Sequence, residues 1–317
     1  MLEYTIRRLF GTVPVLLGIL FIAFVVLYLI PGDPAKTLAG PRASEETIQR
    51  IAKDMGLDQP LHERFLRYLG RVLRGDLGMS MVNDRPVMTS ILEKFPYTLR
   101  LALLALVISV VTGLLAGTLS ALLQRTIWDR LITMLSVAGI SVPIFLTGLI
   151  LLYVFAVQLR WFPTSAFGAK TMFMALFLPA LTLGIRSGAF LARITRSTMI
   201  EVFNEDYIRT ARAKGLSPFR ILWRHALFNA LIPIVTVVAL DLSSFLSGSV
   251  IVETIFELPG LGRFAMEAIS KRDYPVIQGV VLFSAVVFVG INLLVDLLYA
   301  YLNPRVRDEM LQARGNS

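Results

Sequence analysis

The chain has 317 residues, of which 56% are hydrophobic and 17% charged, and its mean hydropathy is +0.70. Because a soluble domain carries about 25% charged residues, this composition excludes an ordinary soluble protein and indicates an all-α polytopic membrane protein. The net charge of +9 comes largely from residues beside apolar runs, where bilayer orientation and lipid headgroups explain it better than nucleic acid. No cysteine is present, which excludes disulfides, thiolate metal sites and cysteine nucleophiles.

Apolar windows of about 19 residues predict six membrane spans. The spans lie near residues 9–30, 98–123, 131–158, 172–192, 227–252 and 276–302. The first follows Arg7 and Arg8 as a signal peptide would, but its apolar run is too long, and Pro31-Gly-Asp-Pro34 stands in place of a cleavage site. We therefore expect a retained first helix.

Lysine and arginine near the span ends favour a cytoplasmic N-terminus and C-terminus. The long 31–97 loop then lies outside the membrane on the extracytoplasmic side. Within it, Ser44 followed by Glu45 and Glu46 predicts a helix start. The apolar spacing from Phe65 to Val72 predicts a second helix. The loop is therefore expected to form a small helical cap.

The loop 193–226, between the fourth and fifth spans, is predicted to contain a helix, a tight reversal and another helix. Asn204 can cap the first helix, Lys214 lies in its last turn, and Gly215 suits the left-handed position after it. Ser217 and Pro218 then suit the start of the second helix.

Apolar residues on this loop, chiefly Tyr207, Ile208 and Leu216, are expected to be exposed and to need a partner surface. Periodicity alone leaves two interpretations equally open. The loop can rest on lipid as an amphipathic segment, or it can dock a soluble subunit.

Three charges lie deep inside the predicted spans, away from the span starts: Arg186, Asp241 and Asp296. Charges at this depth face a partner or a water-filled path, because each costs about 2.5–3.5 kcal/mol to insert. One interpretation pairs Arg186 with Asp241 or with another subunit. The other makes Arg186 a pathway residue that meets an anionic group of the substrate. Glycines spaced by four, at 113 and 117 and at 184 and 188, predict closely packed helices.

Several motifs occur in a shared order along nearly the whole chain. They are Pro31-Gly-Asp-Pro34, Gly56-Leu-Asp-Gln-Pro-Leu61, Gly75-Asp-Leu-Gly78, Arg85-Pro-Val87, Asp206-Tyr-Ile-Arg-Thr-Ala-Arg-Ala-Lys-Gly215, His225-Ala-Leu-Phe-Asn-Ala-Leu-Ile-Pro233, Glu253-Thr-Ile-Phe256, Pro259-Gly-Leu-Gly262, Arg272-Asp-Tyr-Pro275, Asn292-Leu-Leu-Val-Asp296 and Asn303-Pro-Arg305. Together they closely resemble the permease subunits of peptide- and nickel-class ATP-binding-cassette (ABC) importers.

The resemblance implies a type I importer permease fold with an N-terminal segment and first helix (1–30), an extracytoplasmic loop (31–97), a five-helix core (98–302) and a cytoplasmic tail (303–317). It also implies a second permease, two cytoplasmic ATPase subunits that carry ATP and Mg²⁺, and an extracytoplasmic binding protein, in a bacterial inner membrane. The loop around Gly215 becomes the coupling element that docks on the ATPase, with contacts expected from Glu205, Asp206, Tyr207, Ile208, Ala211, Lys214, Gly215 and Leu216.

The chain departs from the general permease motif at two places. Arg209 and Thr210 stand where that motif has glutamate and alanine, so the role of its glutamate does not transfer to Arg209. Phe228 replaces a proline of that motif. Outside the motif, Arg186 stands where an apolar residue is expected in this family. We keep Arg186 and Asp241 as candidate pathway residues.

The sequence holds no phosphate-binding loop of the Gly-x-x-x-x-Gly-Lys-Ser/Thr type, so a non-enzymatic, pore-forming subunit is expected. An intramembrane protease that uses Ser141 lacks a base, because His62 and His225 lie outside the spans. A secondary transporter or channel is a distant alternative. Small peptides, including dipeptides, oligopeptides and glutathione, are the expected cargo, and nickel or another metal chelate is the alternative. No metal site or cofactor of the chain's own is expected.

Overall fold

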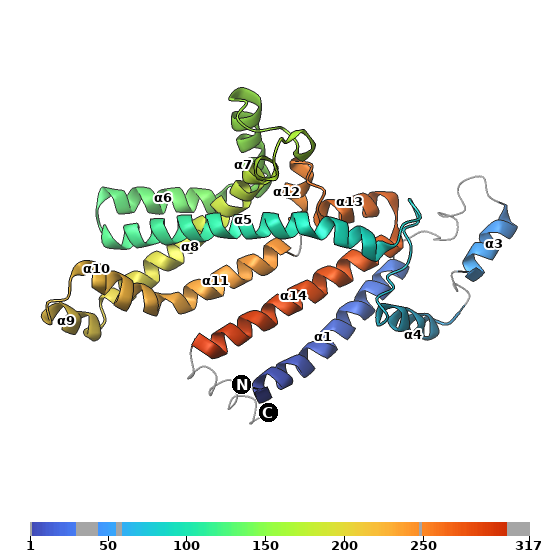
Figure 1. Ribbon diagram of the computed structural model, residues 1–317, viewed down its shortest axis with the longest axis horizontal. Helices are drawn as coiled ribbons and strands as arrows, with labels where there is room; N and C mark the ends of the chain where they lie inside the picture. The colour runs from blue at the N-terminus through green and yellow to red at the C-terminus, as the bar shows by residue number, and fades with distance from the viewer. Residues whose placement is uncertain (1, 30–43, 55–58, 247–248, 303–317) are drawn as a thin grey trace. The chain divides into compact units, whose positions relative to one another are not determined.

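The structure is a computed structural model that describes residues 2–29, 44–54, 59–246 and 249–302 (Figure 1). Within these residues the elements are helices without a strand, and Met79 and Pro86 form an isolated bridge. The all-α prediction is confirmed for this part of the chain. The motifs 31–34 and 303–305, residues 56–58 of the 56–61 motif, the 303–317 tail and the side chain of Asp296 lie outside the described part.

The chain divides into two compact units, one of residues 1–97 and 259–290 and one of residues 98–258 and 291–317. The first unit contains α1 (Leu2–Leu29), α3 (Glu45–Asp54), α4 (Leu61–Val72), the start of α5 (Val87–Leu122), α13 (Leu261–Lys271) and most of α14 (Tyr274–Leu302). Both helices predicted in the 31–97 loop are confirmed. The apolar stripe of α4 packs on α1, where Phe24 stacks on Tyr68 with ring centroids 5.9 Å apart.

The second unit carries the remaining helices. They are α6 (Ile127–Ser141), α7 (Ile144–Leu151), the π-helix η1 (Leu152–Gln158), the 3₁₀ turn η2 (Ala166–Gly168), α8 (Met172–Phe203), α9 (Asp206–Ala213), α10 (Pro218–Arg220), the π-helix η3 (Ile221–Leu227), α11 (Phe228–Leu246) and α12 (Val250–Ile255). Their core gathers residues of α8, α9, η3 and α11 around Leu191, Met199 and Ala230.

The number of spans is a separate question from the helical content. Three helices are long and apolar enough to cross a membrane: Val87–Leu122, Met172–Phe203 and Tyr274–Val295. Two bent pairs raise the number to at most five, one of them turning by 104° between Ser141 and Ile144 and the other by 54° at Pro233. In α1 the apolar described stretch is Phe10–Val25, which is shorter. The six-span count therefore stays a prediction.

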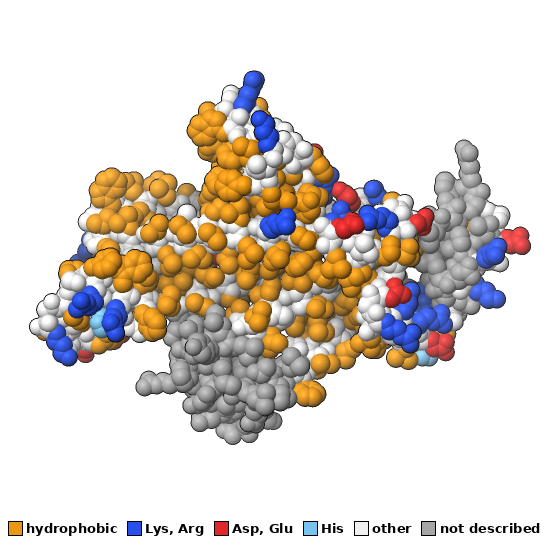
Figure 2. Space-filling model, viewed as in Figure 1, with side chains coloured by type: hydrophobic (Ala, Val, Ile, Leu, Met, Phe, Trp, Pro, Cys, Tyr) orange, Lys and Arg blue, Asp and Glu red, His pale blue; other side chains and the backbone are white. Residues whose placement is uncertain are grey.

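The surface of the second unit fits a lipid environment. Large apolar side chains remain exposed on α5 and α6, and Figure 2 shows many hydrophobic side chains over these helices. They are Leu103, Val107, Val111, Leu115, Leu119, Leu131, Met134 and Leu135. Water would penalise such a patch, whereas lipid or a partner subunit would not.

Both glycine pairs lie where α5 and α8 cross, so the close-packing prediction is confirmed. A Cβ atom on Gly117 would lie 2.6 Å from the Ala192 carbonyl oxygen, and one on Gly184 would lie 2.6 Å from Cγ2 of Ile108. Each helix thus presents glycine to the other at this crossing, and neither glycine leaves room for a methyl group. The crossing fixes the position of α8. This helix contributes residues to the cavity described below and leads directly into the loop after it.

Candidate functional site

The first part of the site is the hinge segment, which we define as residues 204–218. Its helix α9 ends in a Schellman motif, where the Gly215 N–H donates to the Arg212 carbonyl (2.9 Å) and the Leu216 N–H donates to the Ala211 carbonyl (3.3 Å). Gly215 has φ +74°, so the predicted left-handed glycine is confirmed. The chain reverses direction here within two residues.

The start of the second helix also agrees with the sequence. Ser217 Oγ accepts from the Arg220 N–H at 3.4 Å, and Pro218 occupies the first helical position. The cap predicted for the first helix is wrong. Its N-cap residue is Glu205, while Asn204 ends α8 and donates its side-chain amide to the Ile200 carbonyl (3.0 Å). Because α8 runs to Phe203, the amide of Asn204 serves the end of that helix.

The expected exposure of the apolar hinge residues is wrong for Ile208. This side chain is 0% exposed and packs in the second unit's core with Ala211. Leu216 is half-buried against the same cluster, whereas Tyr207 is 40% exposed. The reason is tertiary: α9 packs against η3, so its apolar stripe faces the chain's own core and not a partner.

The outward face of the hinge segment is polar. Glu205, Asp206, Lys214 and Gly215 are exposed there, and basic side chains gather over α9, α10 and η3 (Figures 1 and 2). Arg209 is exposed as well and contacts Asp206 at 3.3 Å, a pair worth little at such exposure. Arg209 was not among the contact residues expected from the sequence. The helical period would have placed it opposite the buried stripe, on the exposed face.

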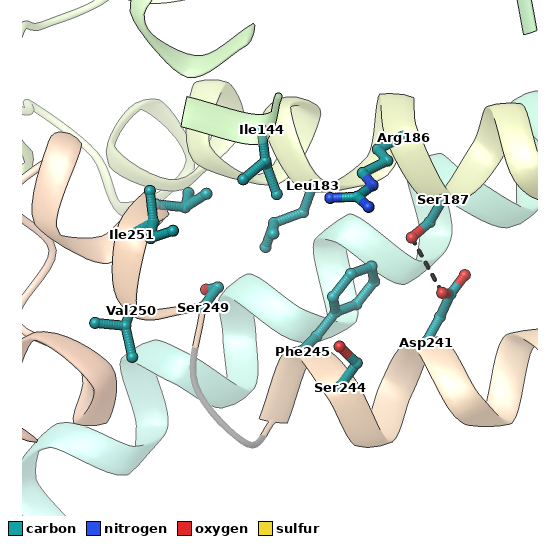
Figure 3. Close-up of a pocket in the computed structure, with 11 residues that line it drawn as sticks. Ile144, Leu183, Arg186, Ser187, Asp241, Ser244, Phe245, Ser249, Val250 and Ile251 are labelled. Atoms are coloured by element: carbon teal, nitrogen blue, oxygen red, sulfur yellow. Dashed lines mark hydrogen bonds between the residues drawn. The ribbon is translucent and has the colours of Figure 1, made fainter. Parts of the chain in front are cut away.

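The second part of the site is a cavity of about 470 Å³ in the second unit. Figure 3 shows that its wall combines apolar, hydroxyl and charged side chains from α8, α11 and α12. Its lining residues are Ile144, Leu183, Arg186, Ser187, Asp241, Ser244, Phe245, Ser249, Val250, Ile251 and Val252. Both candidate pathway residues therefore line the same cavity.

The two charges of this cavity do not pair with each other. Ser187 Oγ donates to Asp241 Oδ1 at 3.1 Å, while the Oδ2 atom of Asp241 is buried without a hydrogen-bond partner in the described part of the chain. No salt bridge in that part involves Arg186, whose side chain is exposed to the cavity. The interpretation that pairs Arg186 with Asp241 is therefore wrong for these residues.

Two further observations bear on the chemistry. The Ser141 hydroxyl donates to the Val137 carbonyl of its own helix at 2.8 Å, so it is engaged with backbone and not with a base. Among the described residues, no three His, Asp or Glu side chains converge as metal ligands.

Comparison with known proteins decides the family. The sequence profile of the binding-protein-dependent transport system inner membrane component matches residues 109–308, and the profile of the N-terminal part of such components matches residues 1–102. The chain belongs to this family. It is thus a membrane component of an importer, pore-forming and not catalytic, and its place is the inner membrane. The predicted resemblance to ABC importer permeases is confirmed.

Individual relatives agree with the family. The glutathione transport system permease protein GsiC of Escherichia coli K12 is 43% identical over 307 residues, which cover 97% of this chain and 99% of GsiC. The protein of the same name from Salmonella paratyphi A is 44% identical over the same lengths. Among solved structures, the inward-facing methionine ABC transporter MetNI shares the fold, with a TM-score of 0.56, 17% identity, and coverage of 68% of this chain and 97% of that one.

Proposed function

We propose that this chain is one of two permease subunits that form the translocation path of an ATP-driven importer for small peptides, with glutathione or a di- or oligopeptide as cargo. The observation that supports this cargo is the identity of 43% across 97% of the chain to a permease named for glutathione transport. A second permease, two ATPase subunits that bind ATP and Mg²⁺, and an extracytoplasmic binding protein complete the system.

The hinge segment is proposed as the docking element for one ATPase subunit. Its exposed residues Glu205, Asp206, Tyr207, Lys214 and Gly215 make the contact. The segment is anchored by its buried apolar residues, which pack in the chain's own core and do not contact the ATPase. These residues are Ile208, Ala211 and Leu216. This division replaces the expectation that all eight residues touch the ATPase.

The hinge segment is suited to transmit force because each of its ends connects directly to a helix of the second unit. Upstream it continues from α8, a helix of 32 residues, and downstream it leads through η3 into α11. Closure of the ATPase pair then moves both helices together. A near-complete switch between two packings needs about 5.5 kcal/mol of differential binding, and the nucleotide cycle of the partner subunits supplies it.

Arg186 and Asp241 are proposed to line the translocation path. A charge left unpaired inside a span costs about 2.5–3.5 kcal/mol unless water or a partner reaches it. Both residues face one cavity without pairing to each other, which favours a wetted path over a sealed helix contact.

Reconstitution tests the proposed function. The complete importer in proteoliposomes, with glutathione and a dipeptide as separate cargoes, is expected to accumulate cargo only when ATP and the binding protein are both present. Omission of the ATPase subunits is the control, and it should abolish uptake. Uphill uptake by this chain alone, or failure of ATPase subunits to copurify with it, would overturn the proposal.

A further inference from the structure

We propose that the cavity between α8 and α11 is a subsite for a dipolar ligand, in which Arg186 binds a carboxylate and Asp241 binds an ammonium group of the same small molecule. The inference rests on the proposed function, because it assumes that cargo passes this cavity. It goes further in assigning a ligand class to the permease itself, apart from any selection by the binding protein.

Two residues of opposite charge, Arg186 and Asp241, line the same cavity but do not form an ion pair with each other. Arg186 extends from α8 into the cavity, while Asp241 comes from α11 with its carboxylate turned to Ser187 (Figure 3). Because Ser187 Oγ holds Oδ1 of Asp241 at 3.1 Å, this serine is a positioning residue that fixes the acid beside the cavity.

A dipolar ligand would bring a carboxylate for Arg186 and an ammonium group for Asp241. A guanidinium presents a planar fork of N–H donors that matches a carboxylate, and in the described part of the chain Arg186 forms no ion pair. Among the described residues, no donor lies within hydrogen-bond distance of the buried Asp241 Oδ2 atom. Because Asp241 lines the cavity, an ammonium group there can approach its carboxylate, and a water that enters with the ligand can donate to Oδ2.

The size and walls of the cavity fit a short peptide. A volume of about 470 Å³ falls within the range of about 300–1,000 Å³ typical of small-molecule sites. Apolar side chains of Leu183, Phe245 and Ile251 lie beside the charges and can contact the carbon chain between the two ionic groups. Amino acids and peptides with both ends free have this combination, whereas singly charged molecules do not.

Direct binding without the binding protein tests the subsite. The assembled permease–ATPase complex is placed in nanodiscs, and calorimetry compares glutathione with N-acetylglutathione, which lacks the ammonium, and with glutathione diethyl ester, which lacks both carboxylates. We expect each modified ligand to bind about ten- to hundredfold more weakly than glutathione, the factor for losing a hydrogen bond to a charged group.

Variants then assign each ionic group to its residue. Arg186→Gln should weaken glutathione binding and remove the difference between glutathione and the diethyl ester. Asp241→Asn should remove the difference between glutathione and N-acetylglutathione. Arg186→Lys keeps the charge and should restore part of the carboxylate discrimination. Arg193→Gln, which removes an exposed arginine of the same helix outside the cavity, is the matched control and should change none of the three affinities.

Equal binding of the three ligands by the wild-type complex would overturn the subsite, as would an equal loss for all three in Arg186→Gln. The second result would show that Arg186 serves assembly, for example by pairing with the second permease. Either result leaves the proposed function standing if the complete importer still takes up glutathione. Absence of uptake by the complete importer, with ligand discrimination intact, would instead overturn the cargo assignment and keep the subsite.

Discussion

Arg196 of α8 and Asp129 of α6 form a bidentate ion pair, with Nε 2.7 Å from Oδ1 and Nη2 2.9 Å from Oδ2. Ser120 Oγ (2.6 Å) and the Arg125 backbone N–H (3.0 Å) donate to the same carboxylate. The carboxylate is therefore fully satisfied although Asp129 is buried. Through these contacts the turn between α5 and α6 is joined to α8, the helix that ends at the hinge segment.

The first prediction concerns this pair. Asp129→Ala leaves Arg196, whose side chain is 30% exposed, without its partner, and losing hydrogen bonds to a charged group costs about 1.5–3 kcal/mol. We expect a clear fall in the melting temperature of the purified permease complex, measured by scanning fluorimetry in detergent. Arg85→Ala is the matched control, since the Arg85–Glu93 pair is half exposed on both sides and should cost less than about 1 kcal/mol. Equal shifts for the two variants would show that the buried pair does not hold the helices.

The second prediction concerns the crossing of α5 and α8. Gly117→Ala places a methyl group 2.6 Å from the backbone carbonyl oxygen of Ala192, so the helices must separate. Overpacking of this kind costs about 1–3 kcal/mol, and a lower melting temperature should report it. Gly290→Ala, in α14 with open space around the added methyl, is the control and should be neutral or slightly stabilising. An unchanged melting temperature in Gly117→Ala would mean that the crossing is looser than the structure has it.

Local signals in the sequence were enough for much of this architecture. The left-handed Gly215, the Ser217–Pro218 start and the glycine pairs at the α5–α8 crossing each depend on a few neighbouring residues and the helical period, and the structure confirms them. The burial of Ile208 depends on how α9 folds back onto η3, which no local pattern encodes.

Long-range pairing could not be predicted for the same reason. Asp129 and Arg196 stand 67 positions apart, and nothing near either residue indicates its partner. One of the two interpretations of the sequence paired Arg186 with Asp241 or with another subunit, because both residues are charges inside predicted spans. In the structure Asp241 accepts from the hydroxyl of Ser187, the residue after Arg186, while Arg186 lines the cavity.

The third prediction concerns the reversal after α9. Gly215 has φ +74° and open space where a Cβ would lie, so a substitution there is limited by the backbone and not by neighbours. Gly215→Val should cost about 1–2 kcal/mol through the left-handed conformation and reduce the ATP hydrolysis that loaded binding protein stimulates. Gly215→Asn, which tolerates this conformation better, should keep most of the stimulation. Normal stimulation in the valine variant would show that the reversal is not needed for coupling.

The fourth prediction concerns alkaline pH and the helix α4. Burial raises the pKa of Tyr68 to about 12, and its hydroxyl has no partner in the described part of the chain. Between about pH 10, where the unfolded phenol ionises, and pH 12, the folded state binds more protons than the unfolded state. Stability therefore falls as pH rises through this window, by up to about 1.4 kcal/mol per pH unit.

Tyr68→Phe isolates this contribution from other groups that titrate in the same range. We expect the variant to equal the wild type at pH 8, because the lost hydroxyl is unpaired, and to exceed it in melting temperature above pH 10. Parallel curves for the two proteins up to pH 12 would show that the phenol is not protected by burial.

The last prediction separates docking from anchoring in the hinge segment. Ile208→Ala removes a fully buried side chain and should cost about 2–5 kcal/mol, so both the melting temperature and the stimulated ATP hydrolysis should fall. Tyr207→Ala removes a side chain that is 40% exposed; the melting temperature should stay, while stimulated hydrolysis falls. Trp161→Ala, which deletes an aromatic ring that is 62% exposed elsewhere in the same unit, should change neither. Full stimulation in Tyr207→Ala would move the docking surface away from this tyrosine, and an unchanged melting temperature in Ile208→Ala would contradict the anchoring role of the buried stripe.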